Sequence, residues 1–305
     1  MMSSNKADYV WMDGDFIKWD DAKVPILTHA LHYGTGVFEG IRAYPSKDNL
    51  NIFRLKDHII RMMNSAKIYY MTPKYSVEDI INRIVELVRK NNLRTRTYIR
   101  PIIYVGYKDI GLNFTGFPIN AAIIAIPFGD YFDTSMLKLR TSSWKRLSEQ
   151  SIPPMAKACG NYLNSVLAKL EAVRDGYDDA IMLDTQGFIS EGTGENIFLT
   201  KGDELITPSY SSSILSGITR DTVKYLANDL GLKVIERQIT RFELYTADEA
   251  FFSGSAAEIA PIVEVDQRLI GFGKPGKWTK KISAAFQEVV TGQNPEYNKW
   301  LTPVY

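Results

Sequence analysis

The spacing of apolar residues constrains the fold of this 305-residue chain more than any other feature of its sequence. Short apolar runs typical of buried strands, such as residues 98–105 and 121–126, alternate with stretches in which apolar residues recur every three or four positions. Ile80, Ile84 and Val88 form one such helical stripe. The two patterns interleave without the even strand–helix–strand rhythm of a Rossmann fold, so we expect an α+β fold.

Turn and capping residues place individual elements. The sequence Asp13-Gly14-Asp15 separates two short strand-like segments and predicts a hairpin. Ser76, with Asp79 three residues later, predicts a capping box at the start of a helix. Further helices are expected around residues 59–66, from 161 to 176, from 219 to 231 and over 279–290. Further strands are expected at residues 137–142, 180–183, 196–200, 233–236, 250–252 and 262–265.

The length and one strong break predict two domains. A domain commonly has roughly 150 residues, so a chain of this length has room for about two. The sequence Pro127-Phe128-Gly129-Asp130 ends the apolar run before it and is typical of a loop. We predict a smaller N-terminal domain over residues 1–126, a linker over 127–136 and a larger C-terminal domain over 137–305.

Composition excludes several classes of function. The 36 Lys and Arg residues nearly balance 35 Asp and Glu residues, and a net charge of +1 argues against a nucleic-acid or anionic-membrane surface. The single cysteine, Cys159, excludes internal disulfides and multi-cysteine metal sites. The first residues lack a secretory pattern, and the most apolar stretch, 119–128, is too short to span a bilayer. We therefore expect a cytoplasmic protein.

Two weaker motifs suggest other functions. Residues 271–276 match the dinucleotide pattern G-x-G-x-x-G, but too few residues follow to complete a βαβ unit. Trp278 stands where a P-loop needs Ser or Thr. His29 and His32 have a spacing that places them on one helical face, but no carboxylate motif accompanies them, so we predict no metal site. A nucleotide-binding or interaction protein built on the glycine-rich loop is the alternative outside enzymes.

Lys157 is the leading candidate for a reactive side chain. It is the only charged residue between Glu149 and Lys169, it lies among small and apolar residues, and a predicted helix begins just after it. The positive end of a helix dipole and desolvation both favour a neutral amine, which is the form that attacks carbonyl groups and builds Schiff bases. The alternative is a lysine whose head group simply reaches solvent.

Three further segments complete a chemical set. Glu191 and Glu195 lie in a glycine-rich loop, where a carboxylate can hold the proton of a pyridine ring. Residues 215–221 begin a predicted helix and residues 253–258 follow a predicted strand, and both can offer backbone N–H groups to an anion. Each segment alone is equally typical of a surface turn or a plain helix cap. Together with Lys157 they match what pyridoxal 5′-phosphate (PLP) requires.

Six strings make this pattern specific. They are HALHYGTGVFEGIRAY (29–44), YIRPIIYVG (98–106), AKACGNYLNS (156–165), ISEGTGENIF (189–198), SGITRD (216–221) and SGSAAEI (253–259). In these strings the chain resembles the class IV, fold-type IV PLP-dependent aminotransferases over nearly its whole length, and specifically the branched-chain amino acid aminotransferases. The resemblance implies a two-domain fold like that of D-amino acid aminotransferase, with the cofactor between the domains.

The resemblance also implies an activity and residue roles. The activity is that of a branched-chain-amino-acid transaminase (EC 2.6.1.42), which interconverts Leu, Ile and Val with their 2-oxo acids and uses 2-oxoglutarate and glutamate as co-substrates. Lys157 would bind the cofactor and move the substrate proton, and Glu191 would pair with the pyridine nitrogen. The other cofactor-binding residues would be Arg61, Tyr162, Ile218, Thr219 and Ser255. The substrate-binding residues would be Tyr33, Phe38, Tyr98, Arg100, Leu112, Tyr131, Ser255 and Ala256.

Two further expectations concern the surroundings of Arg100 and the assembly of subunits. The resemblance assigns Arg100 to the side-chain carboxylate of glutamate, and burying that guanidinium without a partner would be costly when leucine binds. We therefore expect Tyr and backbone groups around Arg100 to keep it solvated or paired when leucine is bound. Tyr33 and Leu112 would come from the neighbouring subunit of a homodimer, or of a larger homo-oligomer.

Alternatives within the family are D-amino acid aminotransferase, (R)-amine transaminase and aminodeoxychorismate lyase. The sequence Tyr98-Ile99-Arg100 and residues 32–42 favour the branched-chain enzyme. Two residues depart from the pattern expected of relatives. Cys159 stands where a small residue such as Gly or Ala is expected, and Phe128 stands where some relatives are expected to have Trp.

Overall fold

The computed structural model describes residues 6–47, 49–132 and 136–305. The chain forms two compact units that are discontinuous in sequence. Unit 1 comprises residues 1–129, 156–160 and 289–305, and unit 2 comprises residues 130–155 and 161–288. Lys157 therefore belongs to unit 1, although the chain on both sides of its short segment belongs to unit 2. The continuous domain limits expected from the sequence stay a prediction, and residues 133–135 of the expected linker lie outside the described residues.

Unit 1 is built on an eight-stranded antiparallel sheet. Its order is β17 (Leu301–Pro303), β5 (Asn49–Phe53), β4 (Ile41–Ser46), β6 (Thr97–Val105), β7 (Ile119–Pro127), β1 (Tyr9–Met12) and β2 (Asp15–Lys18), with β3 (Gly36–Phe38) paired to β6. The predicted hairpin between β1 and β2 is confirmed. Its turn residues Asp13 and Gly14 adopt φ values of 50° and 115°, a conformation that glycine and short polar residues tolerate.

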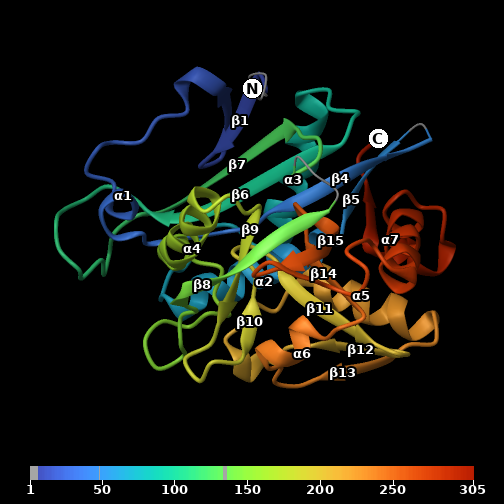
Figure 1. The fold of residues 1–305 in the computed structure, drawn as a ribbon. Helices are drawn as coiled ribbons and strands as arrows, with labels where there is room; N and C mark the ends of the chain where they lie inside the picture. The colour runs from blue at the N-terminus through green and yellow to red at the C-terminus, as the bar shows by residue number, and fades with distance from the viewer. Residues whose placement is uncertain (1–5, 48, 133–135) are drawn as a thin grey trace. The chain divides into compact units, whose positions relative to one another are not determined.

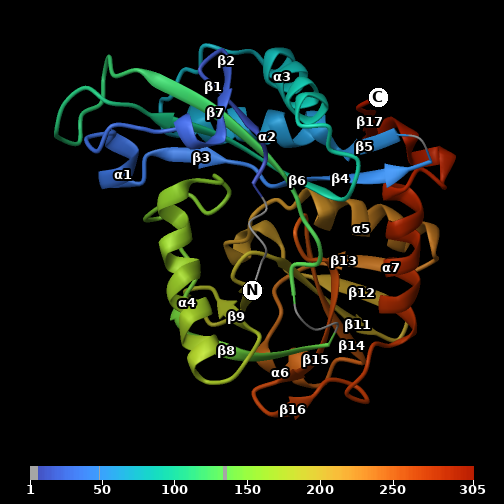
Figure 2. The same ribbon diagram turned by 90° about the horizontal axis from the view of Figure 1, so that it is seen from above.

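Two helices pack against this sheet, α2 (Leu55–Ile68) and α3 (Val77–Lys90), and Figure 2 shows them together beside its strands. The predicted capping box at Ser76 and Asp79 starts α3. Ile80, Ile84 and Val88 are buried in the core that α2, α3 and the sheet share. A short helix, α1 (His29–Tyr33), precedes β3.

Unit 2 is built on a nine-stranded mixed sheet. Its order is β10 (Ile189–Glu191), β9 (Asp179–Leu183), β8 (Leu137–Lys145), β15 (Glu258–Val265), β14 (Glu249–Gly254), β11 (Asn196–Lys201), β12 (Glu204–Thr207) and β13 (Lys233–Glu236), with β16 (Arg268–Leu269) paired to β15. β8 runs parallel to both β9 and β15, and β12 runs parallel to β13. The other pairs are antiparallel, so the sheet lacks Rossmann topology, as the irregular apolar pattern predicts.

The helices of unit 2 pack at different parts of its sheet. α4 (Tyr162–Arg174) packs against β8 and β9, and α5 (Ile218–Asp229) packs against β13 and β14 (Figure 1). α4 buries its small residues Ala168 and Ala172, whereas Leu163 is 69% exposed. The other helical segments of unit 2 are α6 (Arg241–Tyr245), η3 (Tyr210–Ser212) and most of α7 (Lys277–Val290). In unit 1 lie η1 (Trp19–Asp21) and η4 (Pro295–Trp300), and η2 (Cys159–Asn161) spans the limit between the units in the chain. In the parts of the chain that the structure describes, no helix has the length and apolar character needed to cross a membrane.

The glycine-rich segment 271–276 forms the turn that leads into α7. The Glu249 carboxylate occupies the start of this helix, because it accepts hydrogen bonds from Trp278 N at 2.9 Å and Thr279 N at 2.7 Å. A Cβ on Gly276 would collide with the Glu249 side chain. The glycines therefore allow close packing around a carboxylate cap, and that carboxylate stands where a nucleotide phosphate would have to bind.

Candidate active site

The Lys157 segment is pinned to two elements of unit 1. Its backbone N–H donates to Ser65 Oγ of α2 at 3.0 Å, and its carbonyl accepts from Phe38 N at the end of β3 at 3.0 Å. Ala158 forms a bridge with Val37. The Lys157 side chain is half-buried, and its Nζ lies 5.1 Å from the centre of the Phe38 ring. The backbone around the predicted reactive amine is thus fixed from both sides.

A buried ionic cluster joins Glu39, which follows β3, to Arg61 and His58 of α2, one and two turns before Ser65. Arg61 Nε and Nη2 bind Glu39 Oε1 and Oε2 at 2.6 and 2.8 Å, a two-pronged pair, and His58 Nδ1 lies 2.7 Å from Glu39 Oε2. Burial alone would raise the pKa of Glu39, but the Arg61 charge and the His58 hydrogen bond hold it well below its usual range. Burial lowers the pKa of His58, so the neutral ring donates its Nδ1–H to the carboxylate. Arg61, predicted to contact a phosphate, is therefore oriented by Glu39.

Arg100 has one of the kinds of partner that the sequence leads us to expect, a tyrosine hydroxyl, but no described backbone group accepts from it and its buried Nε has no described hydrogen-bond partner. Its Nη2 donates to the Tyr98 hydroxyl at 2.6 Å. Its guanidinium lies 4.6 Å from the centre of the Phe38 ring and 5.2 Å from that of Tyr98. Phe128 in turn packs on Tyr98, with ring centres 5.2 Å apart. Three predicted substrate-binding residues, Phe38, Tyr98 and Arg100, thus lie together in unit 1, and the faces of two rings stabilise the half-buried cation.

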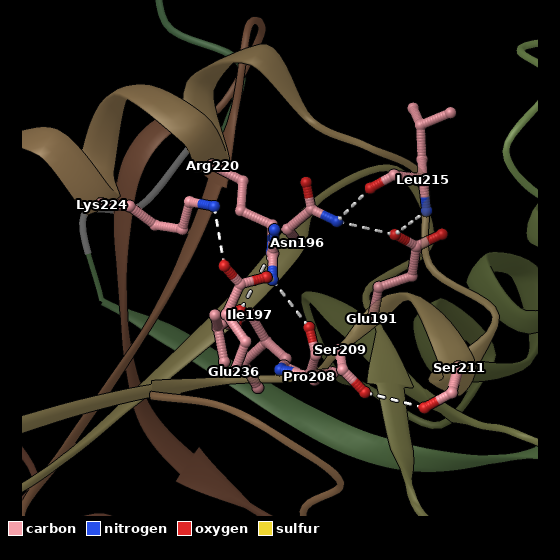
Figure 3. A network of polar contacts seen from close by, with 11 residues as sticks. Glu191, Asn196, Ile197, Pro208, Ser209, Ser211, Leu215, Arg220, Lys224 and Glu236 are labelled. Atoms are coloured by element: carbon pink, nitrogen blue, oxygen red, sulfur yellow. Dashed lines mark hydrogen bonds and ion pairs between the residues drawn. The ribbon is translucent and has the colours of Figure 1, made fainter. Parts of the chain in front are cut away.

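Glu191 is the centre of the candidate site in unit 2. It ends β10 and is 4% exposed. Its Oε1 pairs with Arg146 Nη2 at 2.8 Å. Its Oε2 accepts from Asn196 Nδ2 at 2.9 Å and from Leu215 N at 3.0 Å, and Figure 3 shows these two contacts. A buried carboxylate with a guanidinium partner and two further donors is stabilised in its ionised form.

Asn196 joins three predicted segments of unit 2. Its Nδ2 donates both to Glu191 and to the Leu215 carbonyl at 3.0 Å, as Figure 3 shows. It opens β11 opposite Ser253, near the end of β14. A Cβ on Gly217 would collide with Asn196 Oδ1, so any other residue at the N-cap of α5 would displace the Asn196 side chain. Asn196 thereby brings together Glu191, the start of α5 and the end of β14.

The two predicted anion sites lie at these strand and helix ends. Ile218 and Thr219 form the first turn of the twelve-residue α5, which begins without a side-chain cap at Gly217. Ser255 and Ala256 lie in the turn between β14 and β15, where Gly254 pairs with Glu258. A helix start without a capping side chain is suited to an anion.

Arg220, next to Thr219 at the start of α5, forms a network of polar contacts that holds this helix in place. Arg220 is 1% exposed, and its Nη2 donates to the Pro208 carbonyl at 2.9 Å and to Glu236 Oε2 at 2.6 Å. Lys224 Nζ donates to the other Glu236 oxygen at 2.7 Å (Figure 3). The Arg220 in the SGITRD string therefore ties α5 to β13 and fixes the helix that carries Thr219.

The remaining predicted site residues lie at more exposed positions. Tyr33 is 39% and Leu112 79% exposed, both in unit 1. Tyr131 is 40% exposed in unit 2, and Tyr162 is the half-buried first residue of α4. His29 is bound to Thr35 Oγ1 and the Gly111 carbonyl, and His32 to the Ile26 carbonyl. In the described ranges no group of three or more His, Cys, Asp or Glu residues is arranged to hold a metal ion.

Sequence reasoning missed five residues that shape these sites. They are Glu39, His58, Ser65, Arg146 and Asn196. Glu39 had a signal, because it is a lone acid in an apolar, glycine-rich stretch and a buried acid needs a cationic partner. Arg146 and Asn196 follow or begin strands at positions where polar residues are common, so nothing in the pattern marks them.

Comparisons with known proteins decide the family. The model of the family "Amino-transferase class IV" matches residues 36–265. The chain belongs to the class IV aminotransferases. A branched-chain-amino-acid aminotransferase of Escherichia coli (strain K12) is 45% identical over 99% of both chains. The crystal structure of the branched-chain aminotransferase from Thermoproteus uzoniensis with norvaline has a TM-score of 0.95 and 46% identity, over 98% of this chain and 100% of the other.

A third relative carries a ligand of the expected chemistry. The T.th. branched-chain amino acid aminotransferase complexed with N-(5'-phosphopyridoxyl)-L-glutamate has a TM-score of 0.95 and 43% identity, over 98% of this chain and 99% of the other. The family and the fold-type IV α+β architecture predicted for this class IV aminotransferase are thus confirmed. The roles of its individual residues stay predictions.

Proposed function

We propose that this class IV aminotransferase uses PLP to exchange amino groups between Leu, Ile or Val and 2-oxoglutarate. The observation that carries the proposal is the buried Glu191 carboxylate, which Arg146, Asn196 and Leu215 hold. An ionised carboxylate in fixed position is what a protonated pyridine nitrogen requires. The branched-chain substrate follows from relatives of that name, one of them 45% identical over 99% of both chains.

The donor groups fit the cofactor. Lys157 supplies a half-buried primary amine for an aldehyde, and Glu191 supplies the carboxylate for a ring nitrogen. Ile218 and Thr219 at the uncapped start of α5, with Ser255 in its turn, supply donors for a phosphate. Arg61 adds a cation whose direction Glu39 fixes, and Tyr162 adds a hydroxyl for the phenolic oxygen.

Each residue has a defined task in the reaction. When bound, PLP supplies a carbonyl that takes up an amino group and a ring that withdraws electrons from the neighbouring Cα–H bond. Lys157 Nζ binds the cofactor and, once released, takes the proton from Cα as a general base. Glu191 keeps a proton on the ring nitrogen because Arg146 stabilises its negative charge. The Lys157 backbone is held by the Ser65 hydroxyl and by Phe38 N, and this restricts where Nζ can reach.

One pocket must accept both an aliphatic side chain and a carboxylate, and Arg100 meets this demand. The Tyr98 hydroxyl and the faces of Phe38 and Tyr98 stabilise its guanidinium when leucine is bound. When glutamate binds, its side-chain carboxylate pairs with Arg100 instead. Tyr98 and the Ser255-Ala256 turn hold the α-carboxylate, and Phe38, Tyr131, Tyr33 and Leu112 surround the apolar chain.

The half-reactions test the proposal. The visible absorption spectrum of purified protein with PLP should lose its yellow band when L-leucine is added and regain it with 2-oxoglutarate. A yellow band that ignores L-leucine but responds to a D-amino acid or an (R)-amine would keep the cofactor and reject the substrate. A protein that stays colourless with added PLP would reject the proposal as a whole.

Assembly and location belong to the same proposal. Tyr33 and Leu112 are exposed, which supports a role at a subunit boundary of a homodimer or larger homo-oligomer. Light scattering should give a mass of at least twice the 34.5 kDa of one chain, and a mass of 34.5 kDa would reject this part. We place the enzyme in the cytoplasm, as its composition leads us to expect.

A further inference from the structure

Unit 2 has a polar groove that the proposed reaction does not use. Its volume is about 530 Å³, within the range of small-molecule sites. It is lined by residues of β8 and α6, by the turn between β9 and β10, and by the turn that leads into β16. We call it the basic groove, because Arg140, Lys145, Arg241 and Arg268 all line it.

Three of these cations have no acidic partner among the residues that the structure describes. Lys145, Arg241 and Arg268 are exposed, and none forms an ion pair with a described residue of the chain. Arg268 donates to the Asp266 backbone carbonyl at 2.8 Å, and its guanidinium lies 4.8 Å from the centre of the Tyr245 ring. None of these three described charges is therefore neutralised by a direct ion pair within the chain.

The fourth cation and the acid of the lining are already engaged. Arg140 pairs with Glu171 and Asp175. The Asp266 carboxylate accepts hydrogen bonds from Thr141 N, Thr141 Oγ1 and Tyr245 OH, each at 2.6 Å. Asp266 is thus held by neutral donors of the groove lining and forms no ion pair with a described cation, so it leaves one negative charge beside the three unpaired cations. Since the whole chain carries a net charge of only +1, the positive charge of the groove is local.

We propose that the basic groove binds a small anion with two or more negative charges, a phosphate compound or a polycarboxylate. A multivalent anion neutralises several of the converging cations at once, whereas a monovalent anion leaves most of the repulsion in place. The groove is polar, so it does not favour an apolar ligand. The inference stands apart from the reaction at Lys157 and Glu191, because no groove residue is assigned to that reaction.

Calorimetric titration of the PLP-loaded enzyme at low salt tests the proposal. Sodium pyrophosphate should bind at one site, and added salt should weaken the binding because exposed charges are screened. Sodium acetate should not compete. A second titration with sodium citrate identifies the class. Binding of pyrophosphate alone assigns a phosphate compound, binding of citrate alone assigns a polycarboxylate, and binding of both assigns multivalent anions of either class.

Variants locate the binding. Lys145→Ala and Arg268→Ala should each weaken pyrophosphate binding about fivefold, the effect expected for one exposed ion pair, and the combined change with Arg241→Ala should weaken it at least about fiftyfold. Lys280→Ala removes an exposed cation outside the groove and should leave binding unchanged. Unchanged circular dichroism and thermal midpoint establish that the triple variant is folded.

Two results would overturn the proposal. One is the absence of detectable binding of both pyrophosphate and citrate to the loaded wild-type enzyme at millimolar concentration. The other is a folded triple variant that binds as tightly as the wild type, because the anion would then bind elsewhere.

Discussion

The buried carboxylate of Glu39 is the only acidic group in the described ionic cluster that it forms with Arg61 and His58 in unit 1. It compensates the Arg61 charge and accepts from His58, and its side chain is fully buried. Glu39→Gln removes the carboxylate of the two-pronged pair with Arg61, and breaking such a buried pair costs about 3–5 kcal/mol. We therefore expect a large loss in the free energy of unfolding, measured by urea denaturation.

A matched change at the surface provides the control for Glu39. Glu78 also pairs with a cation, but the pair is long and exposed: its Oε1 lies 3.9 Å from Lys56 Nζ, and both side chains are 69% exposed. Glu78→Gln should therefore change the free energy of unfolding by less than about 0.5 kcal/mol. Equal effects of the two substitutions would show that the Glu39 cluster does not stabilise the fold.

Arg100 should separate the two substrate classes. Arg100→Leu removes the cation proposed to bind the glutamate side chain, so kcat/KM for 2-oxoglutarate should fall roughly 10- to 100-fold. The branched 2-oxo acids should lose less than about threefold, since their side chains carry no charge. Arg94→Leu, which removes an exposed guanidinium elsewhere in unit 1, should leave the ratio unchanged. Similar losses for both substrate classes in Arg100→Leu would contradict the role.

Glu195 makes stability depend on pH. Burial and the nearby charge of Asp179 raise the pKa of Glu195 to about 8, from 4.5. Because the folded state disfavours the ionised carboxylate, this residue lowers stability progressively as the pH rises from about 4.5 to about 8. Glu195→Gln stays neutral and lacks this loss.

The expected measurement is the thermal midpoint of both proteins across that range. The midpoint of Glu195→Gln should gain on that of the wild type as the pH increases, by roughly 2–4 °C for each kcal/mol of difference. Parallel curves for the two proteins would mean that Glu195 is ionised at no extra cost in the folded state.

Among the helices, α3 shows how local sequence signals determine an element. The Ser76 hydroxyl accepts from Asp79 N at 3.1 Å, and the Asp79 carboxylate accepts from Ser76 N at 2.9 Å. Ser76→Ala removes this cap and should lower the free energy of unfolding by about 1 kcal/mol in chemical denaturation. Ser76→Thr keeps a capping hydroxyl and should retain most of that stability. An unaffected alanine variant would show that tertiary packing alone fixes the start of α3.

The sequence predicts long, periodic elements better than short ones. The hairpin of β1 and β2, the strands β6 and β7 and the helices α3 and α5 lie where turn residues, caps and apolar periodicity predict them. The short strands β3, β10 and β16 escape prediction because two or three residues cannot display a period. Their positions depend on pairing with distant strands, which no local pattern encodes.

Across the whole molecule, the sequence predicts which residues belong to the candidate site, but not which distant residues hold them in place. Lys157, Glu191 and Arg100 stand out from local context or from the family strings. Their partners Ser65 and Arg146 come from segments far away in the chain, at positions where polar residues are ordinary. Asn196 lies only five residues after Glu191, but its position at the start of a strand does not mark it as a partner. The grouping of residues 156–160 with unit 1 likewise depends on long-range contacts with β3 and α2.

The assignment of the cofactor to Lys157 is the central claim, and chemical trapping tests it most directly. The PLP-loaded protein is treated with borohydride, which reduces the bond between cofactor and amine, and the digested protein is analysed by mass spectrometry. We predict a single pyridoxyl-modified peptide, with the modification on Lys157, and none in Lys157→Ala. A modification on another lysine, or none at all in the wild type, would contradict the account.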